Sequence, residues 1–455
     1  MNTAEVTLAE VLDFRDRRLS LQREMLSLHP GTLVSFTMNI AGPVKTSAVI
    51  YRLFEDGCEQ LEQVLHTKHL NILCRRKENN VTGCLAFYSV DADAEVLKRL
   101  CIWLEETHPL GRLLDLDVFA PDGAHSSRES LGLAERPCII CGEPGRTCAS
   151  RRLHSVEELQ ETTCELLYDY FLEVDAGEIM SLAAQSLRLE AWTTPKPGLV
   201  DLNNQGSHKD MDMELMMASI SVLAPFFRRF FVLGASSAHE SPEKAFLTMR
   251  KLGLLAEKAM FEATGGINTH KGAIFLIGTI CGACGRLWSP VGLHAELDDI
   301  AVECSRLGKS VLERELNSLR ADVPLSFGEQ LYLKHGITGV RGEIINGLPS
   351  IRRISLPQLK KLTSAGKSLT DAGTVVLLYL IAGVCDTNMI RRGGLALQRQ
   401  TAADTAMLLR LEPCPSPTVI RGLDKEFIEK NLSPGGCADL LAASYFFHFL
   451  AGYHL

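Results

Sequence analysis

The stretch from 193 to 212, TTPKPGLVDLNNQGSHKDMD, carries more reactive side chains than an ordinary connection between helices. Basic side chains bind phosphate, and carboxylates bind Mg²⁺ or act as general bases. The prolines and glycines of this stretch shape its backbone and allow close approach to a ligand. The candidates for phosphate or substrate binding are Lys196, Asn203, His208 and Lys209, and the candidates for catalysis are Asp201, Asp210 and Asp212.

Four further polar motifs stand before or at the start of apolar, helix-like segments: GGINTHKG (265–272), KHGITGVRGE (334–343), DTNMIRRGG (386–394) and LSPGGCADL (432–440). Helix starts carry free N–H groups and a positive dipole end, so we expect several of them to converge on an anion as large as triphosphate. The alternative for any single motif is helix capping or packing, and the repetition favours a site. These motifs add Asn268, His270, Lys271, His335, Arg341, Asp386, Asn388 and Arg391 as binding candidates and Glu343 as a catalytic one.

Two carboxylates stand two positions apart in HPLGRLLDLDVF (108–119), a strand-like segment. The period of two places Asp115 and Asp117 on one face, where they are suited to hold Mg²⁺ against a triphosphate. His108 and Arg112, just upstream, are candidates for phosphate binding. The alternative is an edge strand with solvated acids, which the D-x-D pattern alone favours.

A strand, a small-residue turn and a helix start follow one another in SFTMNIAGPVKTS (35–47). Such a turn presents backbone N–H groups and one lysine, Lys45, to phosphate. The alternative is an ordinary turn with an exposed lysine, and the motif by itself favours that alternative.

Four soft ligands, Cys138, Cys141, Cys148 and His154, lie in CIICGEPGRTCASRRLH. Their spacing is compatible with a structural Zn²⁺ site. The alternative is a connector with reduced structural cysteines, and the spacing does not separate the two.

From 33 to 120 the pattern predicts a strand (33–40), a helix (46–65), a strand hairpin (70–76 and 82–90), a helix (93–108) and a strand (112–120). This βαββαβ order fits a ferredoxin-like or polymerase-palm-like α+β fold. After about 175 the pattern is helical throughout and predicts an all-α bundle with apolar central helices. We therefore expect two domains, 1–175 and 176–455, with a helix that ends at Gly177 near the boundary.

The composition excludes several classes of protein. A net charge of −8 over 455 residues argues against nucleic-acid binding. The first 20 residues lack the pattern of a signal peptide, and the longest uncharged apolar runs fall short of the roughly 20 residues of a membrane span. Without export signals, the 14 cysteines predict reduced thiols and a cytoplasmic location. Neither GKS sequence has the upstream glycine of a P-loop, so a nucleotide would bind in another way.

At these motifs the two halves become recognisable. The second half resembles triphosphoribosyl-dephospho-coenzyme A synthase through EAWTTPKPGLVDLNNQGSHKDMD, GINTHKGAIF, HGITGVRGE, DTNMIRRGG and LSPGGCADLLA. The first half resembles apo-citrate lyase phosphoribosyl-dephospho-coenzyme A transferase through SFTMNIAGPVK, HPLGRLLDLDV and CIICGEPGRTCASRRLHSVEEL. The family's motif before the double glycine usually has one arginine where this chain has two, so the resemblance does not separate Arg391 from Arg392.

The resemblance implies two successive reactions. The second half would join ATP to 3'-dephospho-coenzyme A, keep the triphosphate and release adenine. The first half would transfer the product to a serine of the citrate lyase acyl-carrier (gamma) subunit and release pyrophosphate, with Mg²⁺ as the cofactor. Two alternatives remain: the equivalent pathway for the malonate decarboxylase carrier protein, and a metal-stapled nucleotide-binding module without turnover.

Overall fold

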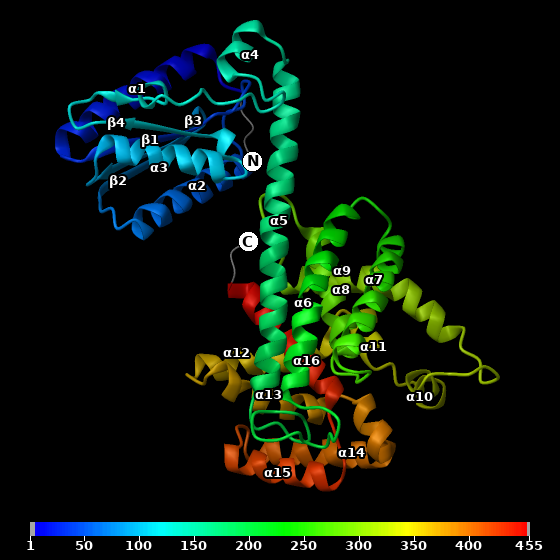
Figure 1. The fold of residues 1–455 in the computed structure, drawn as a ribbon. Coiled ribbons are helices and arrows are strands. Elements are labelled where there is room, and N and C mark those ends of the chain that lie inside the picture. Colours follow the sequence, from blue (N-terminus) through cyan, green and yellow to red (C-terminus); the bar gives the residue numbers. More distant parts are fainter. Residues whose placement is uncertain (1–4, 453–455) are drawn as a thin grey trace. The chain divides into compact units, whose positions relative to one another are not determined.

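The structure is a computed structural model that describes residues 5–452. The chain forms two compact units, Met1–Glu173 (unit 1) and Val174–Leu455 (unit 2). Figure 1 shows a small sheet with helices in unit 1 and only helices in unit 2.

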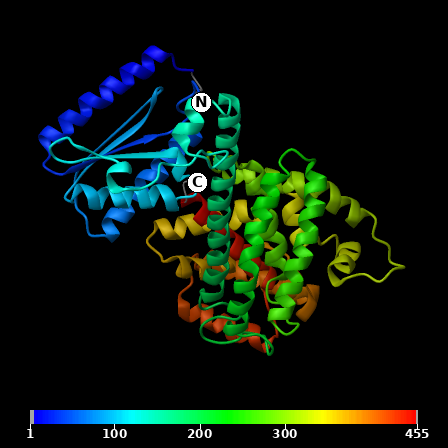
Figure 2. The same ribbon diagram turned by 45° about the horizontal axis from the view of Figure 1, so that its top comes forward.

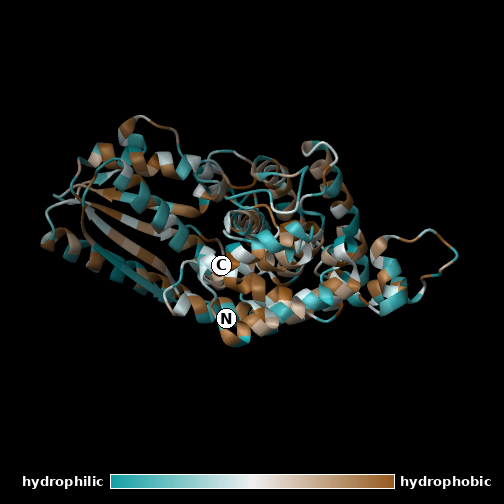
Figure 3. Cartoon of the chain, turned by 90° about the horizontal axis from the view of Figure 1, so that it is seen from below, coloured by the Kyte–Doolittle hydropathy of each residue, from teal (hydrophilic) through white to brown (hydrophobic). Residues whose placement is uncertain are grey.

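Unit 1 contains a five-stranded antiparallel sheet in the order β2-β3-β1-β4-β5. The predicted sequence of strand, helix, strand, strand, helix and strand is found from β1 to β4, preceded by helix α1 and extended by β5. Figure 3 shows the edge strand β2, ILCRRKENN, as largely hydrophilic, whereas β3 is hydrophobic. The elements are α1 (Leu8–Leu28), β1 (Thr32–Met38), α2 (Ala48–Thr67), β2 (Ile72–Asn80), β3 (Gly83–Val90), α3 (Ala94–Thr107), β4 (Leu114–Phe119) and β5 (His125–Ser126).

One face of this sheet carries the two predicted metal ligands. In β4, Asp117 pairs with Ser35 and Asp115 pairs with Thr37 of β1. Leu33, on the same face of β1, packs against Leu21 and Met25 of α1. Because residues two apart in a strand share a face, both aspartates lie on the face that α1 covers.

A long helix, α5 (Val156–Trp192), follows the short helix α4 (Gly145–Arg151). The prediction that a helix ends at Gly177 is wrong, because α5 continues through it and the division between the two units falls within this helix. A glycine inside a helix costs only about 1 kcal/mol relative to alanine. The fully buried Ala176 and Ile179 on either side outweigh that cost.

Unit 2 is helical, as the pattern predicted. Its central pair is α6 (Met213–Ser236) and α8 (Lys271–Leu287), which lie side by side. Small residues allow this contact: a Cβ on Gly285 would meet Phe231 O at 2.0 Å, and one on Gly234 would meet Gly282 O at 2.1 Å. Figure 2 shows the surrounding helices, which are α7 (Pro242–Ala263), α9 (Leu297–Asn317), α10 (Phe327–His335), α11 (Val340–Ile345), α12 (Leu356–Ser364), α13 (Leu369–Gly383), α14 (Thr387–Leu411), α15 (Pro417–Glu429) and α16 (Gly435–Gly452).

Within the described residues, α6 is the single helix that is long and apolar enough to cross a membrane by length and composition. Helices α13 and α14 meet that test only together, as a pair bent by 52°. In this structure α6 packs against α7 and α8.

Candidate functional site

Unit 2 encloses a cavity of about 1100 Å³, and the polar motifs that are far apart in the sequence meet around it. Its walls come from the stretch after α5, the loop before α8, α11 with the loop before it, the α13–α14 junction and the start of α16. Ten of the predicted residues line it: Lys196, His208, Asp210, Asn268, His270, Lys271, Glu343, Asp386, Asn388 and Arg391.

The remaining candidates of unit 2 do not line this cavity; they are Asp201, Asn203, Lys209, Asp212, His335 and Arg341. The Asp201 carboxylate accepts hydrogen bonds from the backbone N–H groups of Lys196 (2.9 Å) and Asn203 (2.7 Å), so it shapes the loop. Asp212 caps α6 by accepting from Leu215 N at 2.9 Å. Arg341 pairs with Glu329 at 3.5 Å.

A buried ion pair joins Lys196 to Glu190, a residue that the sequence reasoning missed. The Lys196 Nζ donates to Glu190 Oε1 at 2.6 Å and to the Glu190 carbonyl oxygen at 2.7 Å. Both side chains are almost completely buried and both line the cavity. Because a lone buried charge is costly, the pairing offsets the cost of burying both groups.

At the starts of three helices, α8, α14 and α16, some N–H groups that were expected to be free donate to carboxylates of the chain itself. The Asp386 carboxylate accepts from Asn388 N (2.8 Å) in its own helix α14 and from Cys437 N (2.8 Å) in α16. Asp439 of α16 accepts from Ala273 N at the start of α8. The chain's own carboxylates therefore occupy part of the positive dipole ends that were expected to bind triphosphate.

The motif DTNMIRRGG forms the first turns of α14, which begins at Thr387, and it ends at a kink at Gly394 (φ 81°, ψ 164°). The second helical part of α14 starts after this kink, so the motif also precedes a helix, as expected. Gly272 is required near this site, because a Cβ there would lie 2.0 Å from Asp439 Oδ2.

Three carboxyl groups on the cavity wall hold protons more tightly than usual. Burial raises the pKa of Asp386, of Glu343 and of Asp439, and the charge of Glu190 adds to the effect at Asp439. Glu343 also accepts from Ser350 N at 3.1 Å and from Ser350 Oγ at 2.5 Å. Carboxyl groups with a raised pKa in a cavity are suited to general acid–base work.

His270 is neutral in this cavity and is not the cation that its place in the motif suggested. Burial, together with the charge of Lys196, lowers its pKa to about 3. Ser219 Oγ accepts from Thr269 Oγ1 (2.7 Å) and lies 2.8 Å from His270 Nδ1. With Ser219 donating to Nδ1, the proton of the ring lies on Nε2, which is buried and has no hydrogen-bond partner.

We expect the protonation of His270 to weaken the fold in acid. Its pKa of about 3 lies below the ordinary value of 6.5, so the unfolded chain binds this proton more tightly. The free energy of unfolding of the wild type should therefore fall, relative to that of His270→Gln, as the pH decreases from 6.5 towards 3. Urea unfolding of both proteins at several pH values measures this difference. A difference that stays constant with pH contradicts the buried neutral state.

Two neighbouring arginines of α14 line the cavity but have different environments. Arg392 donates to Ser207 O (2.8 Å), to Asn431 Oδ1 (2.9 Å) and to His208 Nδ1 (3.2 Å). Arg391 is exposed, and within residues 5–452 it has no ion pair. Arg391 is therefore the arginine available to a ligand.

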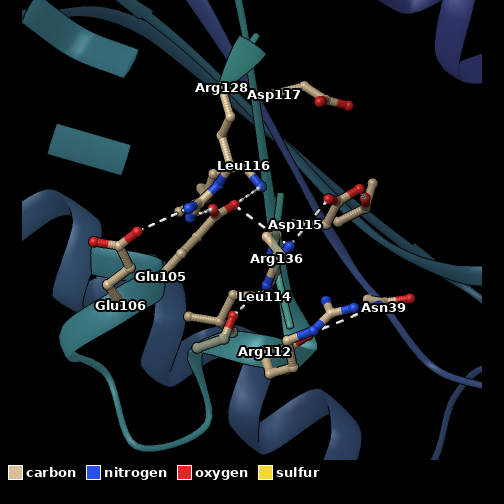
Figure 4. A network of polar contacts seen from close by, with 12 residues as sticks. Asn39, Glu105, Glu106, Arg112, Leu114, Asp115, Leu116, Asp117, Arg128 and Arg136 are labelled. Atoms are coloured by element: carbon tan, nitrogen blue, oxygen red, sulfur yellow. Dashed lines mark hydrogen bonds and ion pairs between the residues drawn. The ribbon is translucent and has the colours of Figure 1, made fainter. Parts of the chain in front are cut away.

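In unit 1, each aspartate of β4 has an arginine partner. Arg136 lies 3.4 Å from Asp115 Oδ1 (Figure 4). Arg18 lies 2.8 Å from Asp117 Oδ2. Burial raises the pKa of the Asp115 carboxyl, and the negative charge of Asp117 adds to this effect. The two acids thus lie on one face of the strand, as the strand period predicted. The guanidinium groups of Arg18 and Arg136 lie beside them.

The other candidates of unit 1 are placed differently. The buried His108 lies 3.0 Å from Asp56 Oδ2 through Nε2 and accepts from Leu110 N (2.9 Å) through Nδ1. Lys45 donates to Ile40 O at 2.6 Å. Both are engaged within the fold, whereas Arg112 lines a second cavity of about 740 Å³.

The four soft ligands of unit 1 come together. The ligand atoms of Cys138, Cys141, Cys148 and His154 all lie within 4.8 Å of one another.

Comparisons with known proteins assign each unit. A family model described as ATP:dephospho-CoA triphosphoribosyl transferase matches residues 176–454, and one described as apo-citrate lyase phosphoribosyl-dephospho-CoA transferase matches residues 6–170. The chain belongs to both families. It is a bifunctional transferase, with unit 1 as the transferase unit and unit 2 as the synthase unit.

Two of the relatives match almost the whole chain, and a third matches its second half. "Protein CitXG" of Haemophilus influenzae is 37% identical over 453 residues, which is 98% of this chain and 96% of that protein. "Protein CitXG" of Leuconostoc mesenteroides is 30% identical over 467 residues, 98% of each chain. The 2-(5''-triphosphoribosyl)-3'-dephosphocoenzyme-A synthase of Klebsiella pneumoniae is 37% identical over 279 residues, 60% of this chain and 91% of that protein.

Sequence reasoning missed three residues of the synthase cavity region: Glu190, Ser219 and Asp439. Asp439 stands inside the motif LSPGGCADL, and Glu190 stands three residues before the polar stretch that begins at 193. Both lie within helices, where acidic residues usually face solvent. Ser219 is fully buried inside the apolar helix α6, and nothing in its surroundings along the chain indicates a role.

Proposed function

We propose that the synthase unit uses its cavity to join ATP to 3'-dephospho-coenzyme A. A ribose hydroxyl of dephospho-coenzyme A attacks the anomeric carbon of ATP, the bond to adenine breaks, and the triphosphate stays on the product. The observation that carries this proposal is the meeting of the polar motifs around one cavity that holds both cations and carboxyl groups. A cavity of about 1100 Å³ is large enough for the ligands of such a reaction.

Cationic and neutral donors of the cavity bind the triphosphate in this proposal. Arg391 and Lys271, whose ammonium group also pairs with Glu257 at 2.7 Å, line the cavity and offer charged donors. His270 offers a neutral N–H from Nε2. Arg392 and His208 hold the loop from 193 to 212 in place through their mutual contact. Lys196, which is paired with Glu190, supplies positive charge from the wall.

In this proposal, carboxyl groups of the same cavity bind Mg²⁺ and accept the proton of the attacking hydroxyl. Glu190, Asp386 and Asp439 line this cavity and are the proposed carboxylate candidates for Mg²⁺, which is usually held by one or two carboxylates together with substrate phosphates. When bound, Mg²⁺ neutralises charge on the triphosphate. Glu343 and Asp439, whose pKa values are raised, are the candidates for the base that accepts the proton of the attacking hydroxyl.

In the transferase unit, we propose that a serine of the citrate lyase acyl-carrier subunit attacks the α-phosphate of the synthase product. The bond to pyrophosphate breaks, and the phosphoribosyl-dephospho-coenzyme A group passes to the serine. Asp115 and Asp117 are the proposed Mg²⁺ ligands, and Arg112 binds phosphate. The sheet order β2-β3-β1-β4 supports the ferredoxin-like or palm-like class for this unit.

We also propose a cytoplasmic location for the protein.

Release of adenine tests the synthase proposal. The purified protein is incubated with ATP, Mg²⁺ and 3'-dephospho-coenzyme A, and free adenine is measured. We expect adenine only when dephospho-coenzyme A is present. If ATP binds and no adenine appears above the control, the chain is a nucleotide-binding module and the proposal fails. The identity of the carrier is tested by offering the citrate lyase carrier and the malonate decarboxylase carrier together and measuring which of them is labelled.

We expect Arg391→Ala to raise the KM for ATP in adenine release by about 10-fold to 100-fold, because a charged hydrogen bond to phosphate contributes roughly 1.5–3 kcal/mol. Steady-state kinetics of adenine release measures this change. Arg410→Ala is the matched control, since Arg410 is exposed in the last turn of the same helix and does not line the cavity. Equal KM values for the two variants would exclude Arg391 from triphosphate binding.

A further inference from the structure

The Cys/His cluster of the transferase unit has the geometry of a preformed metal site. The Sγ atom of Cys148 lies 3.5 Å from that of Cys138 and 4.0 Å from that of Cys141. All three cysteines are free. A tetrahedral Zn²⁺ with bonds of about 2.3 Å to sulfur separates two thiolate ligands by about 3.8 Å, and the two observed distances lie on either side of this value.

His154 provides an independent observation that points to a ligand. Its Nε2 atom is buried and has no hydrogen-bond partner in the described chain. A buried imidazole nitrogen without a partner is costly unless a metal or a donor occupies its lone pair. One ring nitrogen of His154 and the three sulfur atoms all lie within 4.8 Å of one another.

We propose that Cys138, Cys141, Cys148 and His154 bind one Zn²⁺ ion as a closed structural site. Three thiolates and one imidazole are a soft donor set, which selects Zn²⁺ over the hard ion Mg²⁺. Four protein ligands complete a tetrahedron and leave no position for substrate or water. The ion therefore organises the chain and takes no direct part in the transfer.

The segment that this ion holds also positions the proposed phosphate and metal ligands. Arg112 Nε donates to the carbonyl oxygen of Pro137, next to Cys138. Arg136 donates to the carbonyl oxygens of Gly111 (2.6 Å) and Leu114 (2.7 Å) and approaches Asp115. Figure 4 shows Arg136 beside Asp115 and near Arg112. The zinc site thus anchors residues 136–138 against the start of β4.

The cluster also forms part of the wall of the 740 Å³ cavity of the transferase unit. Cys138, Cys148 and His154 line it together with Arg112 and Arg152. Two guanidinium groups at one cavity are suited to bind phosphate groups. Zinc would therefore support the transfer reaction by maintaining the shape of the cavity wall that binds phosphate. This effect rests on the proposed function of the unit.

Metal analysis of the full-length protein, purified without chelators, tests the site. We expect one Zn²⁺ per chain in the wild type and in Cys164→Ser, whose exposed cysteine lies outside the cluster. Cys141→Ser and His154→Ala should lose the ion, whereas His154→Cys should keep it because four cysteines also bind Zn²⁺. Absence of zinc from the wild type, or full zinc in both Cys141→Ser and His154→Ala, would overturn the site.

The two activities separate this inference from the proposed function. In His154→Ala we expect carrier labelling from supplied triphosphoribosyl-dephospho-coenzyme A to fall at least 10-fold, with adenine release unchanged and labelling retained in His154→Cys. If zinc is lost and labelling stays at the wild-type level, the ion does not shape the cavity. If the zinc-loaded wild type labels no carrier, the proposed transfer reaction fails while the metal site stands.

Discussion

Adenine release should fall by at least about 100-fold in Asp439→Asn, because a general base or a metal-binding carboxylate in a closed site contributes this much or more. The substitution keeps the shape of the side chain and its place beside Gly272, where no room for a larger group exists. It replaces the carboxyl group near Glu190 on the cavity wall by an amide, which can neither accept the proton nor bind the metal as a carboxylate. The initial rate of adenine release at saturating ATP and dephospho-coenzyme A measures the effect.

The control for Asp439→Asn is Asp404→Asn, which changes an exposed aspartate of α14 away from the cavity. Transfer to the carrier from a supplied intermediate should be unchanged in both variants. If Asp439→Asn releases adenine at a rate within a factor of two of Asp404→Asn, Asp439 is neither the base nor a ligand of the catalytic metal.

The double variant Asp115→Asn with Asp117→Asn should lose carrier labelling by about 1000-fold while adenine release continues. Both carboxylates lie on one face of β4, and their loss removes the proposed Mg²⁺ ligands that stabilise the pyrophosphate leaving group. Labelling of the apo carrier with supplied triphosphoribosyl-dephospho-coenzyme A measures the loss.

A matched control for this double variant is Asp122→Asn, in the turn after β4, where the exposed carboxylate accepts from Ala124 N at 2.9 Å. Thermal unfolding should accompany the assay, because Arg18 and Arg136 lose their partners in the double variant. A folded double variant that labels the carrier like Asp122→Asn would show that the metal site of the transferase lies elsewhere.

The sequence by itself determined the type of most elements. Alternation of apolar and polar residues over 33–120 predicted β1 to β4 and the two helices between them, because the period of a half-buried strand differs from that of a helix. Apolar runs predicted α6, α8, α13 and α16. The shorter helices α10, α12 and α15 lie outside these apolar runs, in the half whose pattern predicted helices in general but not these individual elements. The end of a helix at Gly177 was wrong, because burial of its neighbours outweighs the weak propensity of glycine.

The motifs themselves were readable from the sequence, since Gly, Pro, His and charged residues stand out against apolar helices. Only the tertiary structure decided which of them share a cavity. It brought Glu190 and Asp439 to that cavity from inside helices, and it paired Asp386 with the start of α16, 51 residues away. It also made His270 neutral and separated Arg391 from Arg392. The reason is that charge state and availability depend on burial and on partners across the fold, which local spacing along the chain does not encode.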